Sequence, residues 1–186
     1  MKNKTIWIVV GIIVVLGIVI FAQYNGLVRA DLDVGVKWAE VENQFQRRVD
    51  LVPDLVSVAN RVATYEKSVI DDVVNARAAL AGATASTEDK IAANNELDGA
   101  ISRLLVVMEN YPQIKADQAY IRLMDEMAGT ENRIAVARQN YNNSIGDYNV
   151  KTRVIPAAWF AKAFGFGIKP YYEVPQESMV KPNYDI

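Results

Sequence analysis

The feature that most constrains the fold of this chain is a seam of apolar positions that alternate four and three residues apart. All but Arg48 and Glu66 are apolar; the positions are Val34, Trp38, Val41, Phe45, Arg48, Val52, Leu55, Ala59, Val62, Glu66, Val69, Val73, Ala76 and Leu80. This spacing places its members on one face of a helix and is typical of coiled-coil packing. The seam therefore predicts long helices that pack along one another.

Pro53 lies within this seam, and the spacing passes through it without a change of phase. A proline inside a helix removes a backbone hydrogen bond and clashes with the preceding turn. The continuous phase favours one kinked helix. The local sequence "VDLVPDL" favours a helix that ends near Asp50 and a second that begins at Pro53. The residues themselves leave both possibilities open.

Two further seams follow the interrupting segment "AGATASTED", in which Gly82 can close one helix and Ser86 or Thr87 can cap the next. The phase shifts again at Pro112, which marks a joint. The second seam is Leu97, Ile101, Leu104, Met108 and Tyr111; the third is Tyr120, Met124, Met127, Glu131, Ile134, Arg138, Tyr141, Ile145 and Tyr148.

These seams predict helices at about residues 28–51, 53–81, 88–110 and 113–152. Short connections make antiparallel neighbours of consecutive helices. The predicted fold class is all-α: an N-terminal transmembrane helix, then an elongated antiparallel four-helix bundle over residues 25–152, then an aromatic, proline-containing tail over residues 153–186.

The N-terminal segment carries an uncharged apolar run from Ile6 to Ala22, with Trp7 near one end and Tyr24 at the other. A helix of about 20 such residues spans a bilayer, and aromatic residues favour its two interfaces. A cleaved signal peptide is the rival interpretation, but the run is longer than the roughly 7–15 residues of a signal core. We therefore expect a retained anchor over residues 6–24.

The charges that flank this segment predict its orientation. Lys2 and Lys4 precede the span, whereas Arg29 follows it close to Asp31 and Asp33. Positive residues remain on the cytoplasmic side, so we expect residues 1–5 in the cytoplasm and the bundle on the other side of the membrane.

Composition excludes several kinds of site. The chain has 186 residues, a net charge of −2, and neither cysteine nor histidine. The usual zinc ligands, thiol nucleophiles and imidazole bases are therefore missing, and the sequence predicts no metal, no cofactor and no enzymatic activity. Nucleic-acid-binding domains are strongly basic, so nucleic acid is not an expected partner.

Four charged residues occupy seam positions: Arg48, Glu66, Glu131 and Arg138. Their charges cancel, and buried charges persist only when paired because each costs several kcal/mol to desolvate. We therefore predict a structural polar network across helices, which the neighbouring residues Arg47, Asp50, Arg77 and Glu109 complete. The alternative is that Glu66 and Glu131 form a carboxylate pair for acid–base catalysis or metal binding.

The pair Tyr-Asn occurs at Tyr141-Asn142 and again at Tyr148-Asn149, seven residues later. Both tyrosines occupy equivalent seam positions, so the repeat indicates a packing period rather than a twofold ligand site. We expect the rings to face neighbouring helices, and the asparagines to form hydrogen bonds at the edge of the seam.

The tail after residue 152 is rich in aromatic residues, with lysines among them. Trp159, Phe160, Phe164 and Phe166 are the interface candidates. Such clusters suit a membrane interface. They equally suit a contact between subunits or a cap over the end of the bundle, and the sequence leaves these three possibilities open.

Several ordered motifs resemble one family. They are "YNGLV" after the span, "VENQFQRRVDLVPDLV" (residues 41–56), Tyr65-Glu66, Ala76-Arg77, "ENYPQIKA" (109–116), "ENRIAVARQNYNNSIGDYN" (131–149) and "KPYYE" (169–173). Together they resemble the LemA family of bacterial membrane-anchored proteins. The family often has His-Glu where this chain has Tyr65-Glu66, so no role of that histidine applies here.

The resemblance implies a bacterial source, with the anchor in the plasma (inner) membrane and the bundle tethered outside it. It also implies a four-helix bundle and favours a full turn near Val52 and Pro53. It implies no reaction, and it links relatives to envelope and internal-membrane organisation. We therefore expect a non-enzymatic scaffold that contacts the lipid bilayer, forms homo-oligomers and organises the envelope membrane. The alternative is an adaptor or sensor for a protein partner, such as a protease or a signalling complex. A hydrolase built on Glu66 and Glu131 is the third hypothesis.

Overall fold

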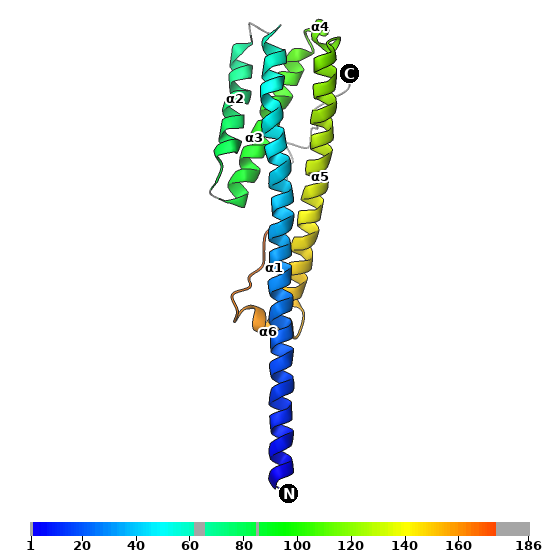
Figure 1. The fold of residues 1–186 in the computed structure, drawn as a ribbon. Coiled ribbons are helices and arrows are strands. Elements are labelled where there is room, and N and C mark those ends of the chain that lie inside the picture. The colour runs from blue at the N-terminus through cyan, green and yellow to red at the C-terminus, as the bar shows by residue number, and fades with distance from the viewer. Residues whose placement is uncertain (1, 62–65, 85, 174–186) are drawn as a thin grey trace. The chain divides into compact units, whose positions relative to one another are not determined.

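A computed structural model describes residues 2–61, 66–84 and 86–173, and these residues form helices joined by short connections, without a strand among them (Figure 1). In chain order the helices are α1 (Lys2–Asn60), α2 (Lys67–Gly82), α3 (Thr87–Met108), α4 (Pro112–Lys115), α5 (Gln118–Arg153) and α6 (Ala157–Ala161). The prediction of an all-α chain with a long apolar N-terminal helix is confirmed for these residues.

α1 continues through Pro53 to Asn60, as the unbroken phase of the seam indicates; the alternative of a break at Pro53, which the local sequence and the family resemblance favour, is wrong. In a regular helix the carbonyl oxygen of Val49 would accept the N–H of residue 53, which proline lacks. Arg77 of α2 replaces that donor: its Nε donates to the Val49 oxygen at 2.9 Å. The side chain of Pro53 is exposed. The predicted helix 53–81 is divided between α1, which ends at Asn60, and α2, which begins at Lys67. Val62 and Tyr65 lie outside the described residues.

The predicted boundaries at Gly82 and Ser86 agree closely with the helix ends, whereas the predicted start near residue 28 lies inside α1. α2 ends at Gly82, and the Ser86 hydroxyl accepts a hydrogen bond from the backbone N–H of Asp89 at 3.0 Å, which caps α3. Pro112 is the first residue of α4. This single turn precedes α5, so the predicted helix 113–152 is two helices rather than one.

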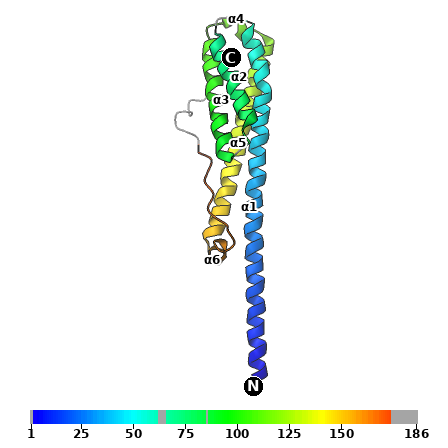
Figure 2. The same ribbon diagram turned by 90° about the vertical axis from the view of Figure 1, so that its left-hand side faces the viewer.

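The chain divides into two compact units. Unit 1 holds Met1–Ala39 and Gln139–Tyr171; unit 2 holds Glu40–Arg138 and Tyr172–Ile186. In unit 2, α2 and α3 pack side by side (Figures 1 and 2). The predicted seam residues form its core; among those buried are Val41, Val52, Leu55, Val73, Leu97, Leu104, Met108, Met124 and Ile134.

Unit 1 has a core of its own between α1, α5 and the segment after α5. Its buried residues include Leu27, Ala30, Val34, Tyr141, Ile145, Tyr148, Ala157 and Ala161. The start of α1 is different: the large apolar side chains from Ile6 to Val19 are exposed, and this stretch extends beyond the other elements of the unit (Figure 1). By length and composition, α1 is the one described helix that could cross a membrane.

Candidate functional site

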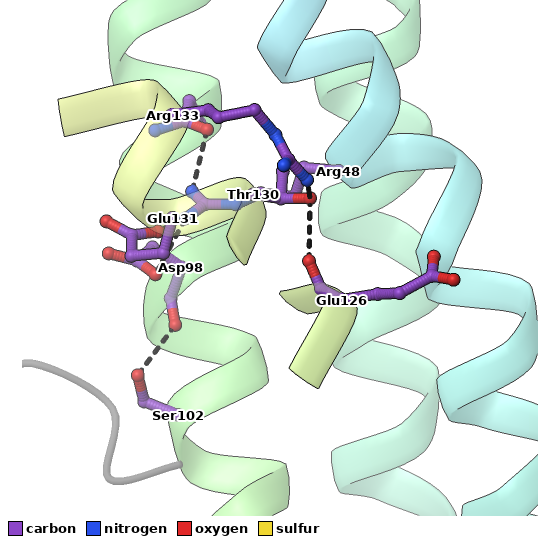
Figure 3. A network of polar contacts seen from close by, with 8 residues as sticks. Arg48, Asp98, Ser102, Glu126, Thr130, Glu131 and Arg133 are labelled. Carbon is purple, nitrogen blue, oxygen red and sulfur yellow. Dashed lines mark hydrogen bonds and ion pairs between the residues drawn. The ribbon is translucent and has the colours of Figure 1, made fainter. Parts of the chain in front are cut away.

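A buried arginine forms the centre of a polar cluster in unit 2. Arg48 of α1 is only 5% exposed, and its Nη1 donates to Oδ1 of Asn94 on α3 at 2.8 Å. Its Nη2 forms ion pairs with Asp98 of α3, at 3.5 Å, and with Glu131 of α5. Asp98 and Glu131 lie next to each other in Figure 3. One guanidinium therefore links three helices, as its planar set of donors allows.

The carboxylates of this cluster are enclosed. The side chains of Asp98 and Glu131 are 19% and 28% exposed, and the oxygens that face Arg48 are buried. Among the described residues these two oxygens have no hydrogen-bond partner, so their pairing with Arg48 is what balances their charge. Removal of the guanidinium would leave two neighbouring carboxylates without a counter-charge, which is costly at a buried site.

Tyr172, from the C-terminal tail, belongs to the same cluster. Its side chain is 5% exposed, and the guanidinium of Arg138 lies 5.7 Å from the centre of its ring, which is a cation–π geometry. Burial raises the pKa of the Tyr172 hydroxyl, against the opposing effects of Arg138, Arg48 and a hydrogen bond with Asn94. The tail thus brings Arg138, through Tyr172, to the residues around Arg48.

Local hydrogen bonds support the helices that carry the cluster (Figure 3). The hydroxyl of Thr130, which is buried, donates to the backbone oxygen of Glu126 at 2.8 Å, and Arg133 donates to Thr130 at 3.3 Å. On α3, Ser102 donates to the backbone oxygen of Asp98 at 2.8 Å. Each of these two hydroxyls therefore donates to a backbone oxygen of its own helix.

The remaining predicted network residues lie elsewhere. Arg77 binds the Val49 carbonyl, as described above. Arg47 and Asp50 are exposed, and Asp50 accepts a hydrogen bond from Gln46 at 2.8 Å. Glu109 is exposed at the end of α3.

Glu66 precedes α2 and is half-buried. Within the described ranges, the carboxylate that shares Arg48 with Glu131 is that of Asp98 rather than that of Glu66. The same residues contain no group of three or more acidic side chains arranged to hold a metal ion.

Two partners of Arg48 were missed in the sequence, although a signal for one of them exists. Asn94 lies three residues before Leu97, so it continues the second seam towards the N-terminus and is buried as a seam residue should be. Asp98 follows a seam residue and has no such signal. Tyr172 lies far along the chain from its partners, and periodicity within a helix cannot predict a contact of that kind.

In unit 1, the second Tyr-Asn pair holds the tail. The Asn149 side chain donates from Nδ2 to the Lys169 carbonyl and accepts the Lys169 N–H at Oδ1, both at 2.9 Å. The ammonium of Lys169 lies 3.0 Å from Asp31 and 5.2 Å from the centre of the Tyr148 ring. Burial is the main cause that raises the pKa of Tyr148. The negative charge of Asp31 raises it further, whereas the positive charge of Lys169 lowers it.

The first Tyr-Asn pair packs within the same unit. The Tyr141 ring lies 5.2 Å from the Trp38 ring, centre to centre, and Asn142 is half-buried at the edge of the seam. The two pairs thus have different neighbours: Tyr141 packs on a residue of α1, whereas Tyr148 and Asn149 hold the segment that contains Lys169.

The four aromatic interface candidates differ in their surroundings. Phe164 and Phe166 meet the Tyr24 ring edge-on, at 5.2 and 6.0 Å between centres. Phe160 stacks near Phe164 at 6.4 Å. Trp159, by contrast, is 67% exposed. Part of the aromatic cluster therefore packs against the end of the apolar run, and part faces outwards.

Three known proteins are similar to this chain in sequence. The magnetosome proteins MamQ 1 and MamQ 2 of Paramagnetospirillum magneticum are each 25% identical to this chain over 176 residues, which cover 81% of the chain and 65% of each relative. The magnetosome protein MamQ of Magnetospirillum gryphiswaldense is 25% identical over 175 residues, with 81% and 64% coverage. The chain thus spans slightly less than two thirds of the length of these relatives.

One family model matches a large part of the chain. The model of the LemA family matches residues 37–185, which include α2 to α6 and the part of α1 that carries Arg48. Because this match covers well over half of the chain, the protein belongs to the LemA family.

Proposed function

We propose that this protein is a non-enzymatic, membrane-anchored scaffold that self-assembles and organises or shapes the bacterial envelope membrane. The observation that carries the proposal is the continuity of α1 in unit 1. The exposed apolar side chains from Ile6 to Val19 and the buried residues Leu27, Ala30 and Val34 belong to one helix with no linker between them. A membrane span joined in this way holds unit 1 close to the bilayer.

The dimensions of the helix support the anchor. Trp7 and Tyr24 are exposed, and a helix that rises about 1.5 Å per residue separates them by roughly 26 Å. The hydrocarbon core of a bilayer is about 30 Å thick, and aromatic side chains favour its two boundaries. With Lys2 and Lys4 before the span and Asp31 and Asp33 after it, we propose a cytoplasmic N-terminus in the plasma membrane.

The polar cluster supports a structural role. Arg48 joins α1, α3 and α5, and Arg77 joins α2 to α1. We propose that these helices form the antiparallel four-helix bundle that the sequence predicts, with the cluster fixing their register. The relatives are magnetosome proteins by name; we extend to this chain a role in membrane organisation.

Self-assembly is supported by a strip on α1 directly after the span. Leu32 and Val36 are 64% and 57% exposed and lie one turn apart, with Gly35 beside them in open space. Exposed apolar side chains around a glycine let two helices approach closely. Anchors in one membrane also confine the chains to a plane, which raises the effective concentration for such contacts.

The native mass in a mild detergent tests the assembly. We expect the native mass of the wild type to be a defined multiple of 20.7 kDa. The double variant Leu32→Lys/Val36→Lys should have a lower native mass, because the added charges oppose an apolar contact. Val74→Lys is the matched control: Val74 of α2 is also exposed, and the variant should keep the wild-type mass.

A monomeric wild-type protein would contradict self-assembly. A complex with one stoichiometric partner protein would instead favour the adaptor role.

A further inference from the structure

The segment that follows α5 exposes five large apolar side chains, which together we call the tail surface. It consists of Val154, Ile155, Trp159, Phe164 and Ile168, whose exposed fractions are 52%, 67%, 67%, 43% and 59%. We infer that the tail surface lies in the headgroup layer of the bilayer that α1 spans, as a second membrane contact of unit 1. This inference rests on the proposed membrane anchor.

The first argument is the position of the tail surface along α1. A cavity of about 230 Å³ is lined by Gln23, Gly26 and Leu27 of α1 together with residues 154–157. Tyr24 also meets Phe164 and Phe166. Val154, Ile155 and Phe164 of the tail surface are therefore level with residues 23–27, the first turn after the apolar run; Ile168 lies beside Lys169, which pairs with Asp31 further along α1. That turn rises about 6 Å, and the headgroup layer is about 5–7 Å thick on each side.

The second argument is that the exposed side chains stand on a held backbone. Ala157 and Ala161 of α6 are buried, and Asn149 holds the backbone of Lys169 through two hydrogen bonds. A Schellman turn closes α6: the N–H groups of Phe166 and Gly165 bind the carbonyls of Ala161 and Lys162 at 2.9 and 3.3 Å. Gly165 supplies the left-handed conformation that this turn requires, with φ +81°.

The third argument is charge. Between Asp147 and Glu173 the chain has four basic residues and no acidic one. Lys169 is paired with Asp31, whereas Lys151, Arg153 and Lys162 are exposed near the tail surface. Anionic headgroups attract basic side chains at this depth, and tryptophan beside lysine is typical of the interface.

A packing role alone does not explain the tail surface. Phe164 and Phe166 pack against Tyr24, but more than half of the surface of Ile155 and of Trp159 remains exposed. Exposed large side chains beside a membrane span are placed where they can enter the interface. A lipid surface therefore fits the position, the charge and the apolar character together.

Spin labels on single cysteines test the inference in the full-length protein, because the chain has no cysteine of its own. The labels are placed by Ile155→Cys and, as a second variant, Trp159→Cys, in vesicles of phosphatidylcholine and phosphatidylglycerol. Accessibility to oxygen and to a water-soluble nickel complex gives the depth of each label. We expect labels at 155 and 159 to be accessible to oxygen and partly shielded from nickel.

Two controls calibrate the depth scale. A label from Leu16→Cys, within the apolar run, should be shielded from nickel. A label from Asn140→Cys should be open to it, because Asn140 is exposed and precedes Tyr141, which packs on Trp38, about 21 Å beyond Tyr24 along α1. If labels at 155 and 159 match the label at 140, the inference is overturned.

Low accessibility to both reagents, with dipolar broadening between labels, would also overturn it and would indicate a second copy of the chain. A label at 16 that is open to nickel would overturn the proposed anchor itself.

Discussion

At the scale of single residues, Arg48 is the one charged residue that is buried among those that the structure describes. It is buried at a seam position where an apolar residue would be expected, and it meets Asn94, Asp98 and Glu131. A buried charge of this kind adds little net stability by itself but makes the loss of one partner costly. Its value to the fold is that only one register of the three helices satisfies all three contacts.

Replacement of Arg48 by alanine tests this view. We expect Arg48→Ala to lower the free energy of unfolding by about 3 kcal/mol, since two carboxylates would lose their counter-charge. The exposed neighbour Arg47 provides a matched control, because surface substitutions change stability by about 0.5 kcal/mol or less. Chemical denaturation followed by circular dichroism measures both. Equal losses for the two variants would contradict the role of the cluster.

Tyr172 makes the same cluster sensitive to alkaline pH. Its pKa is raised in the folded protein by burial, so as pH rises the unfolded chain loses the phenolic proton first, near pH 10. The folded state then holds more protons than the unfolded state, and stability falls with rising pH. The contribution of Tyr172 is therefore complete below about pH 10 and is lost above it.

The variant Tyr172→Phe cannot ionise at this position. We expect its free energy of unfolding to decline less steeply with pH above about 10 than that of the wild type. Denaturation at a series of alkaline pH values gives the two slopes, and the phenolate absorbance should lose a late-titrating component. Identical slopes in the two proteins would show that Tyr172 does not ionise differently in the folded state.

At the scale of elements, the continuity of α1 depends on a side chain from α2. Pro53 deprives the Val49 carbonyl of its helical donor, and Arg77 supplies another at 2.9 Å. A carbonyl left without a donor at a partly buried position costs about 1–3 kcal/mol. The helix therefore tolerates Pro53 because α2 lies beside it. The local sequence around Pro53 contains no such donor, and for this reason it favoured a break.

A double-mutant cycle measures this dependence. Arg77→Ala should cost about 1.5–3 kcal/mol in the wild type, the range for a charged donor. It should cost less in the Pro53→Ala background, because residue 53 then donates its own N–H to Val49. We expect a coupling of at least about 0.5 kcal/mol from unfolding measurements. Equal costs of Arg77→Ala in the two backgrounds would refute the substitution of one donor for the other.

The elements were predictable where their signals are local. The seams, Gly82, Ser86 and Pro112 predicted helices and ends that the structure confirms, since periodicity and capping act within a few residues. At Pro53 the local signals conflicted: the phase of the seam favoured a continuous helix, whereas the sequence around the proline favoured a break. The course of α1 through Pro53 depends on Arg77, which lies 28 residues from Val49 in sequence.

At the scale of the whole molecule, the contacts of the tail were the least predictable. Tyr172 reaches residues near Arg48, and Lys169 reaches Asn149 and Asp31. Aromatic and basic composition left a membrane interface, a subunit contact and a cap over the bundle end all open, because composition contains no distance between residues. The structure adds which of these side chains are held and which face outwards. The scaffold and the membrane contact proposed here both depend on that division.

The two hydrogen bonds of Asn149 also affect the entropy of membrane contact. They tie together residues 20 positions apart, and closing a flexible loop of that length costs roughly 2–3 kcal/mol. That cost belongs to folding, so it does not recur when the tail surface meets lipid. A preorganised surface loses little conformational freedom on binding. Its affinity for a bilayer should therefore follow the exposed apolar area and the basic charge, with little penalty for ordering the chain.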